Sequence, residues 1–109
     1  MNKQITKKQL MIEVRNNLTL SLVQFKTEWS GASQIISPVY EELAHSYKGA
    51  VNFFSIDIDE ETAAAEEFGV TEIPTILFFK NGKVVDHVIG LTPKNVLIMK
   101  IENALTQNN

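Results

Sequence analysis

The segment LSLVQFKTEWSGASQIISPVYEELAHSYKG, residues 20–49, carries the pattern that decides the fold. Its first part is rich in apolar and aromatic residues, which predicts a buried strand over 20–27. A turn is expected over 29–32, where Trp, Ser, Gly and Ala follow one another. Apolar residues then recur at three- and four-residue spacing, which predicts a helix over 33–48. Pro38 lies inside this helix and is expected to kink it, because proline removes one backbone donor.

The sequence on either side of this segment continues the alternation of helices and strands. Thr6 and Gln9 have the spacing of a capping box and predict a helix over 7–16. A second β-rich run covers 51–58 and ends in an acidic stretch. Asp59 is expected to cap a short helix over 60–68, because acidic side chains favour the N-terminal end of a helix.

The C-terminal part predicts a β-hairpin followed by a helix. Two β-runs, 75–80 and 83–89, are joined by Asn81-Gly82, which is a strong signal for a tight hairpin turn. The final helix is predicted over 93–105, with Thr92 as its cap and a proline at its first position.

These elements predict one α/β domain that spans residues 1–109. No repeat, low-complexity tract or linker divides the chain. Strands linked by a helix are expected to pair in parallel and the hairpin strands to pair antiparallel. The predicted fold is therefore a mixed central sheet with helices on both faces.

Composition excludes several classes of function. The 109 residues include no cysteine, so the chain offers no thiolate nucleophile, disulfide or cysteine-ligated metal. A net charge of −3 argues against a nucleic-acid surface. No stretch approaches the ~20 apolar residues of a membrane span, and no signal-peptide core is present. We expect a cytoplasmic protein with no membrane or nucleic-acid partner.

Other chemistry finds little support. The acidic run 57–61 lacks the glycine and the closing glutamate of a calcium loop, and the two histidines have no zinc-site spacing, so no metal site is expected. A serine hydrolase needs a base near its nucleophile. His45 lies twelve residues after Ser33 on the same predicted helix, ~18 Å along its axis, too far to form a dyad.

Three motifs together resemble the thioredoxin family. They are VQFKTEWSGASQIISP (23–38), FGVTEIPT (68–75) and FFKNGK (78–83), followed by Gly90. They occur in the order and spacing of that family, and the resemblance extends from about residue 20 to residue 105. It implies a thioredoxin fold with a cis peptide bond between Ile73 and Pro74.

The same resemblance shows what this chain has lost. Ser30 and Ser33 stand where the family has its two reactive cysteines, and Gln24 stands where the family usually has a buried aspartate. Ser55 replaces a lysine near that acid, and Lys26 replaces a common aromatic residue. A hydroxyl cannot form a mixed disulfide. We therefore expect no catalytic residue, no cofactor and no disulfide reductase activity, and we interpret both serines as hydrogen-bonding groups at the helix N-terminus.

Three functions remain open. The first is a redox-inactive module that binds an extended polypeptide segment, acting as a monomer or weak dimer. The resemblance implies that its groove would be formed by Trp29, Ile58, Ile73, Pro74, Ile89, Gly90 and Leu91. The second is a thiol-disulfide oxidoreductase present as a Cys-to-Ser form at positions 30 and 33. The third is a structural domain without a groove ligand.

Overall fold

The computed structural model describes residues 2–107, and their strands form a single mixed sheet. The strands are β1 (Asn2–Gln4), β2 (Leu20–Lys26), β3 (Val51–Asp57), β4 (Thr75–Lys80) and β5 (Lys83–Ile89). Their spatial order is β1-β3-β2-β4-β5. β3 pairs in parallel with β1 and β2, whereas β4 pairs antiparallel with β2 and β5. The predicted mixed sheet is confirmed.

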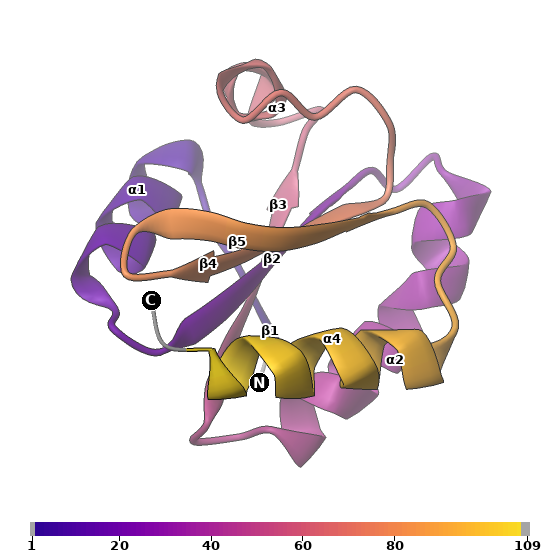
Figure 1. Cartoon of the computed structure of the whole chain (residues 1–109). Helices are drawn as coiled ribbons and strands as arrows, with labels where there is room; N and C mark the ends of the chain where they lie inside the picture. The colour runs from indigo at the N-terminus through magenta and orange to yellow at the C-terminus, as the bar shows by residue number, and fades with distance from the viewer. Residues whose placement is uncertain (1, 108–109) are drawn as a thin grey trace.

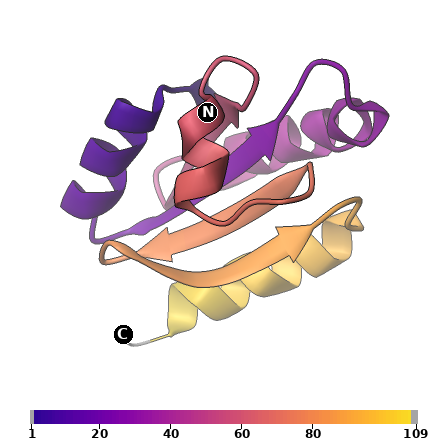
Figure 2. The same ribbon diagram turned by 90° about the horizontal axis from the view of Figure 1, so that it is seen from above.

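Four helices cover the two faces of this sheet (Figure 1). They are α1 (Lys7–Asn16), α2 (Gly31–Ser46), α3 (Thr62–Glu67) and α4 (Lys94–Thr106). One apolar cluster joins the sheet to α2 and α4, and a second joins the opposite face to α1 and α3. Figure 2, seen from above, shows α1 and α3 on the near side of the sheet and α2 farther back. The central strands β2, β3 and β4 are therefore buried on both faces, as expected for strands covered by helices.

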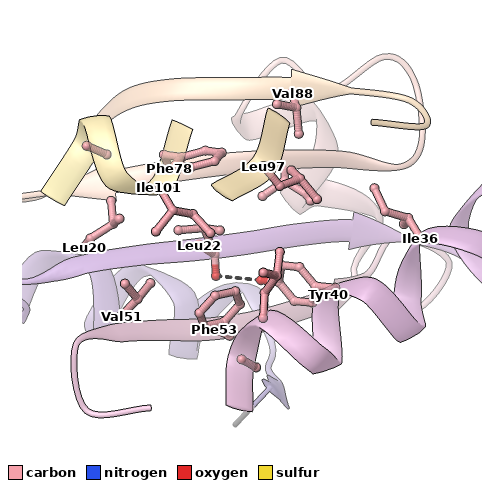
Figure 3. Packing of buried hydrophobic residues seen from close by; sticks show 14 residues of the cluster. Leu20, Leu22, Ile36, Tyr40, Val51, Phe53, Phe78, Val88, Leu97 and Ile101 are labelled. Carbon is pink, nitrogen blue, oxygen red and sulfur yellow. Dashed lines mark hydrogen bonds between the residues drawn. The ribbon is translucent and has the colours of Figure 1, made fainter. Parts of the chain in front are cut away.

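The core beneath α2 contains one polar anchor, the hydroxyl of Tyr40 (Figure 3). Tyr40 is fully buried, and its ring lies edge-on to Phe53 with the centroids 5.1 Å apart. Its hydroxyl proton is shared between the carbonyl oxygens of Leu22, at 3.0 Å, and Phe54, at 2.6 Å. The side chain thus ties α2 to both central strands and sets the position of the helix over the sheet.

The local turn signals at 6–9 and 81–82 are confirmed. The Thr6 hydroxyl accepts from the Gln9 amide at 3.1 Å, and the Gln9 side chain accepts from the Thr6 amide at 2.9 Å. Asn81 and Gly82 both have positive φ, at 55° and 78°. Two successive residues with positive φ suit the twist of a two-residue hairpin.

Two predicted helix caps are wrong. Asp59 does not cap a helix over 60–68; its own amide donates to the Asp57 carboxylate at 2.8 Å, and the helix is shorter, Thr62–Glu67. Thr92 does not cap the last helix either, because its hydroxyl donates to the Gly90 carbonyl oxygen at 3.3 Å. At the first place the Asp57 carboxylate closes the turn after β3, and at the second place the Thr92 hydroxyl closes the turn after β5.

The remaining differences concern boundaries and one unpredicted strand. Helix α2 starts at Gly31, two residues before the predicted start, and runs through Pro38 to Ser46. The structure also contains β1, which sequence reasoning missed because Asn2-Lys3-Gln4 is short and polar. This strand forms because β3 offers it a free edge, where Ser55 donates to the Asn2 side-chain oxygen at 2.8 Å.

Candidate functional site

The N-terminus of α2 lies where β2 ends and is organised by Ser30. The Ser30 hydroxyl accepts from the Ser33 amide at 3.1 Å, which is an N-cap contact. The Ser30 amide in turn donates to the Thr27 hydroxyl at 3.1 Å. Trp29 precedes the cap with 88% of its surface exposed. The turn is therefore fixed by hydroxyl groups, while its aromatic residue faces solvent.

Ser33 has a different role from the one expected. Only 1% of its surface is exposed, and its hydroxyl has no hydrogen-bond partner among the residues that the structure describes. The interpretation of both serines as capping groups is thus correct for Ser30 and wrong for Ser33. The cap at this helix start is instead supplied by Ser30, whose hydroxyl accepts from the Ser33 amide.

Replacing each serine by alanine separates these roles. Ser30→Ala is expected to lower the free energy of unfolding by about 1 kcal/mol, since it removes the cap. Ser33→Ala is expected to change it by less than about 0.5 kcal/mol, because no hydrogen bond is lost. Urea unfolding measures both. An equal loss for the two variants would contradict these assignments.

The position of the family's buried acid is occupied by a neutral network. Gln24 lies on β2 with 1% exposure, and its side-chain nitrogen donates to the Ser37 hydroxyl at 3.4 Å. That hydroxyl donates to the Ser33 carbonyl oxygen at 2.7 Å. Ser55 is also buried and bonds to Asn2 on β1. A carboxylate that could accept a proton from a thiol is absent from this network.

The residues predicted to form a groove lie in two connected segments beside this turn. The Ile73–Pro74 peptide bond is cis, and the Pro74 carbonyl oxygen accepts from the Gly90 amide at 2.7 Å. Because Phe25 pairs with Thr75 across β2 and β4, the cis-proline loop lies at the same end of the sheet as the turn that follows β2. Ile89 and Leu91 are exposed, Ile58, Ile73 and Gly90 are half-buried, and Pro74 is buried.

Ile58 and Ile73 differ from the other residues predicted to form the groove. Ile58 packs against the apolar cluster under α3, so part of its surface serves the core. Ile73 offers backbone groups: within residues 2–107 its amide and carbonyl have no hydrogen-bond partner. An extended segment could use these groups to pair with the loop.

Sequence reasoning missed the contribution of Ile35. Its spacing in the helix suggested a core position, yet 64% of its surface is exposed. With Val39, Leu91 and Pro93 it lines an apolar depression of about 280 Å³ between α2 and the loop after β5. The apolar periodicity did not separate Ile35 from Ile36: the buried positions of α2 are Ser33, Ile36, Tyr40, Leu43 and Ala44, and Ile35 lies outside that face.

Other candidate chemistry is not assembled. His45 and His87 are both exposed, on α2 and β5. Among residues 2–107 no cluster of His, Cys, Asp and Glu could hold a metal ion. The helices of the described part of the chain are too short or too polar to cross a membrane.

The sheet order, the capped helix after β2 and the cis-proline loop define an α/β protein with the thioredoxin fold. The family model for thioredoxin matches residues 2–103. The chain belongs to the thioredoxin family.

Relatives support this assignment over most of the chain. It is 36% identical to thioredoxin 2 of Chlorobaculum tepidum over 97 residues, which cover 89% of each protein. It is 43% identical to a thioredoxin of Staphylococcus saprophyticus over 86 residues, covering 79% of this chain and 83% of the relative. A third, thioredoxin 1 of a Nostoc species, is 33% identical over 94% of this chain and 95% of its own length.

Proposed function

We propose that this protein is a redox-inactive thioredoxin-like module that holds an extended polypeptide beside the cis-proline loop. The observation that carries the proposal is the unpaired backbone of Ile73, at the same end of the sheet as an exposed tryptophan. Main-chain pairing supplies affinity in this mode, and neighbouring side chains supply selectivity. The chain has no cysteine with which to react with what it binds.

The surroundings of Ile73 support a peptide rather than another partner. Trp29, Ile35, Ile89 and Leu91 are exposed apolar side chains, and Ile35 and Leu91 line one depression. Aromatic residues with this degree of exposure are frequent anchors of protein interfaces. We propose a protein or peptide partner in the cytoplasm, with the module acting as a monomer or weak dimer.

The alternative is a thioredoxin whose two cysteines have been replaced by serine at positions 30 and 33. That replacement alone would not produce Gln24 and Ser55, each of which is buried and bonded to a neutral side chain. These two positions favour a protein whose interior no longer serves disulfide exchange.

Tryptophan fluorescence and amide NMR shifts provide the test, because Trp29 is the single tryptophan of the chain. Peptides of about ten residues from a random immobilised library would be selected for binding and then titrated. The best binders are expected to change Trp29 emission and to shift the amide signals of Ile73 and Gly90. Trp29→Ala is expected to weaken binding by about 2 kcal/mol, roughly thirtyfold.

Leu18→Ala is the matched control, because Leu18 is a comparably exposed apolar residue at the other end of β2. Its binding should equal that of the unmodified protein. Peptides that bind without moving the Ile73 signal, or with equal affinity for both variants, would exclude the proposed groove. A library that yields no binder would favour a structural domain instead.

A further inference from the structure

A separate pocket of about 420 Å³ opens beside the first turns of α2. Its walls include Lys26 and Glu28 from the end of β2, and Ser33, Ser37 and Glu41 from α2. None of the residues predicted to form the peptide groove lines it. The three α2 residues are spaced four apart, so they occupy one face of the helix.

The Lys26 side chain lines this pocket, and its positive charge has no close hydrogen-bonded partner among the described residues. Only 17% of its side chain is exposed, and its ammonium lies 3.7 Å from a Glu28 carboxylate oxygen. Charge-assisted hydrogen bonds are about 2.7–2.9 Å long. Within residues 2–107 Lys26 makes no side-chain hydrogen bond, although an ammonium group has three donors.

Ser33 adds a second unsatisfied donor to the same wall. Its hydroxyl is buried and unpartnered, and the residue lines the pocket. The pocket also adjoins the N-terminus of a 16-residue helix, where the helix dipole favours a negative group. Lys26, Ser33 and the positive end of the helix therefore border one pocket, and each of them favours an acceptor with negative charge.

The outer wall of the pocket carries negative charge. Glu28 has 76% of its side chain exposed, and Glu41 is also exposed, with one oxygen occupied by the Asn2 amide at 2.6 Å. A bare anion would be repelled by these carboxylates. A ligand that carries an N–H group beside its negative group would meet donors inside and acceptors outside.

We propose that this pocket binds the carboxylate of an amino acid or of a peptide C-terminus. Lys26 and Ser33 donate to the carboxylate oxygens, and Glu28 accepts from the N–H group on the adjacent carbon. A free amino acid offers an ammonium there, whereas a peptide C-terminus offers an amide. The proposal is independent of peptide binding beside the cis-proline loop.

Among the residues that line the pocket, Lys26 is the one with a positive charge.

Amide NMR titration of the full chain with glycine, N-acetylglycine and glycinamide tests the proposal. Glycine or N-acetylglycine is expected to shift the Ser33 and Gln34 amides with a dissociation constant in the millimolar range, as befits so small a ligand. Glycinamide keeps the amino group and lacks the carboxylate, so it should bind at least about tenfold more weakly. Stronger binding of glycine identifies a free amino acid, and stronger binding of N-acetylglycine identifies a peptide C-terminus.

Substitutions at Lys26 and Ser33 test whether these side chains bind the carboxylate. Lys26→Met keeps the length of the side chain without its charge and should weaken carboxylate binding at least about tenfold, as should Ser33→Ala. Lys26→Trp should abolish it by filling the pocket. Lys48→Met, on the exposed segment after α2, is the control and should bind like the unmodified protein.

Three outcomes would overturn the proposal: no carboxylate shifts these amides up to about 100 mM, glycinamide binds as well as glycine, or Lys26→Met binds unchanged. None of these outcomes bears on the proposed peptide groove, because binding there is measured by the peptide-induced amide shifts of Ile73 and Gly90.

Discussion

Cysteines placed at positions 30 and 33 are expected to create only a slow disulfide reductase. The helix N-terminus would favour the thiolate at position 30, so the variant Ser30→Cys/Ser33→Cys should accelerate insulin reduction by a dithiol reductant. The unmodified protein, with no cysteine, should not exceed the buffer rate. The double variant should remain slow because Gln24 cannot accept a proton from the thiol at position 33.

Adding Gln24→Asp to that double variant is expected to raise the rate by about 10²-fold, the lower end of what a positioned acid–base group contributes. Asn95→Asp, on the exposed surface of α4, is the matched control and should leave the rate unchanged. If the double variant is already fast with Gln24 in place, the interior is still suited to disulfide exchange. That result would favour the Cys-to-Ser form of an oxidoreductase over the module proposed above.

Tyr40→Phe is expected to lower the free energy of unfolding by about 1–3 kcal/mol. The variant keeps the ring in the core and removes the one hydroxyl proton that the Leu22 and Phe54 carbonyl oxygens share, so both carbonyls lose a buried partner. Tyr47→Phe is the control, because its hydroxyl bonds to the exposed Glu102. The control should change stability by less than about 0.5 kcal/mol in urea unfolding. Equal effects would show that the buried hydroxyl does not anchor α2.

The same residue makes stability depend on alkaline pH. Burial raises the pKa of Tyr40 well above its ordinary value of 10.0, so the folded protein keeps the proton that the unfolded chain releases near that pH. Its contribution is therefore complete below pH 10 and is lost as the pH rises above it. The difference in stability between the unmodified protein and Tyr40→Phe should narrow above pH 10. A difference in stability that stays constant above pH 10 would contradict the raised pKa of Tyr40.

Features that depend on neighbours in sequence were predictable. The capping box at Thr6 and the hairpin at Asn81-Gly82 each require residues a few positions apart, and both are present. The apolar periodicity of α2 located that helix to within two residues at each end. The caps predicted at Asp59 and Thr92 were wrong because side chains near these helix starts close turns instead: the Asp57 carboxylate accepts from the Asp59 amide, and the Thr92 hydroxyl donates to the Gly90 carbonyl oxygen.

The sequence by itself determined the order of the elements from α1 onward, the mixed sheet and the absence of a dithiol, because these follow from local pattern and residue identity. Only the tertiary structure decided how polar groups pair across distant segments. It brought Asn2 to Ser55, gave Tyr40 two strand carbonyls, and left Ser33 buried without a partner beside Lys26. Hydrogen bonds between residues far apart in the chain depend on the packing of whole elements, and no local pattern encodes them.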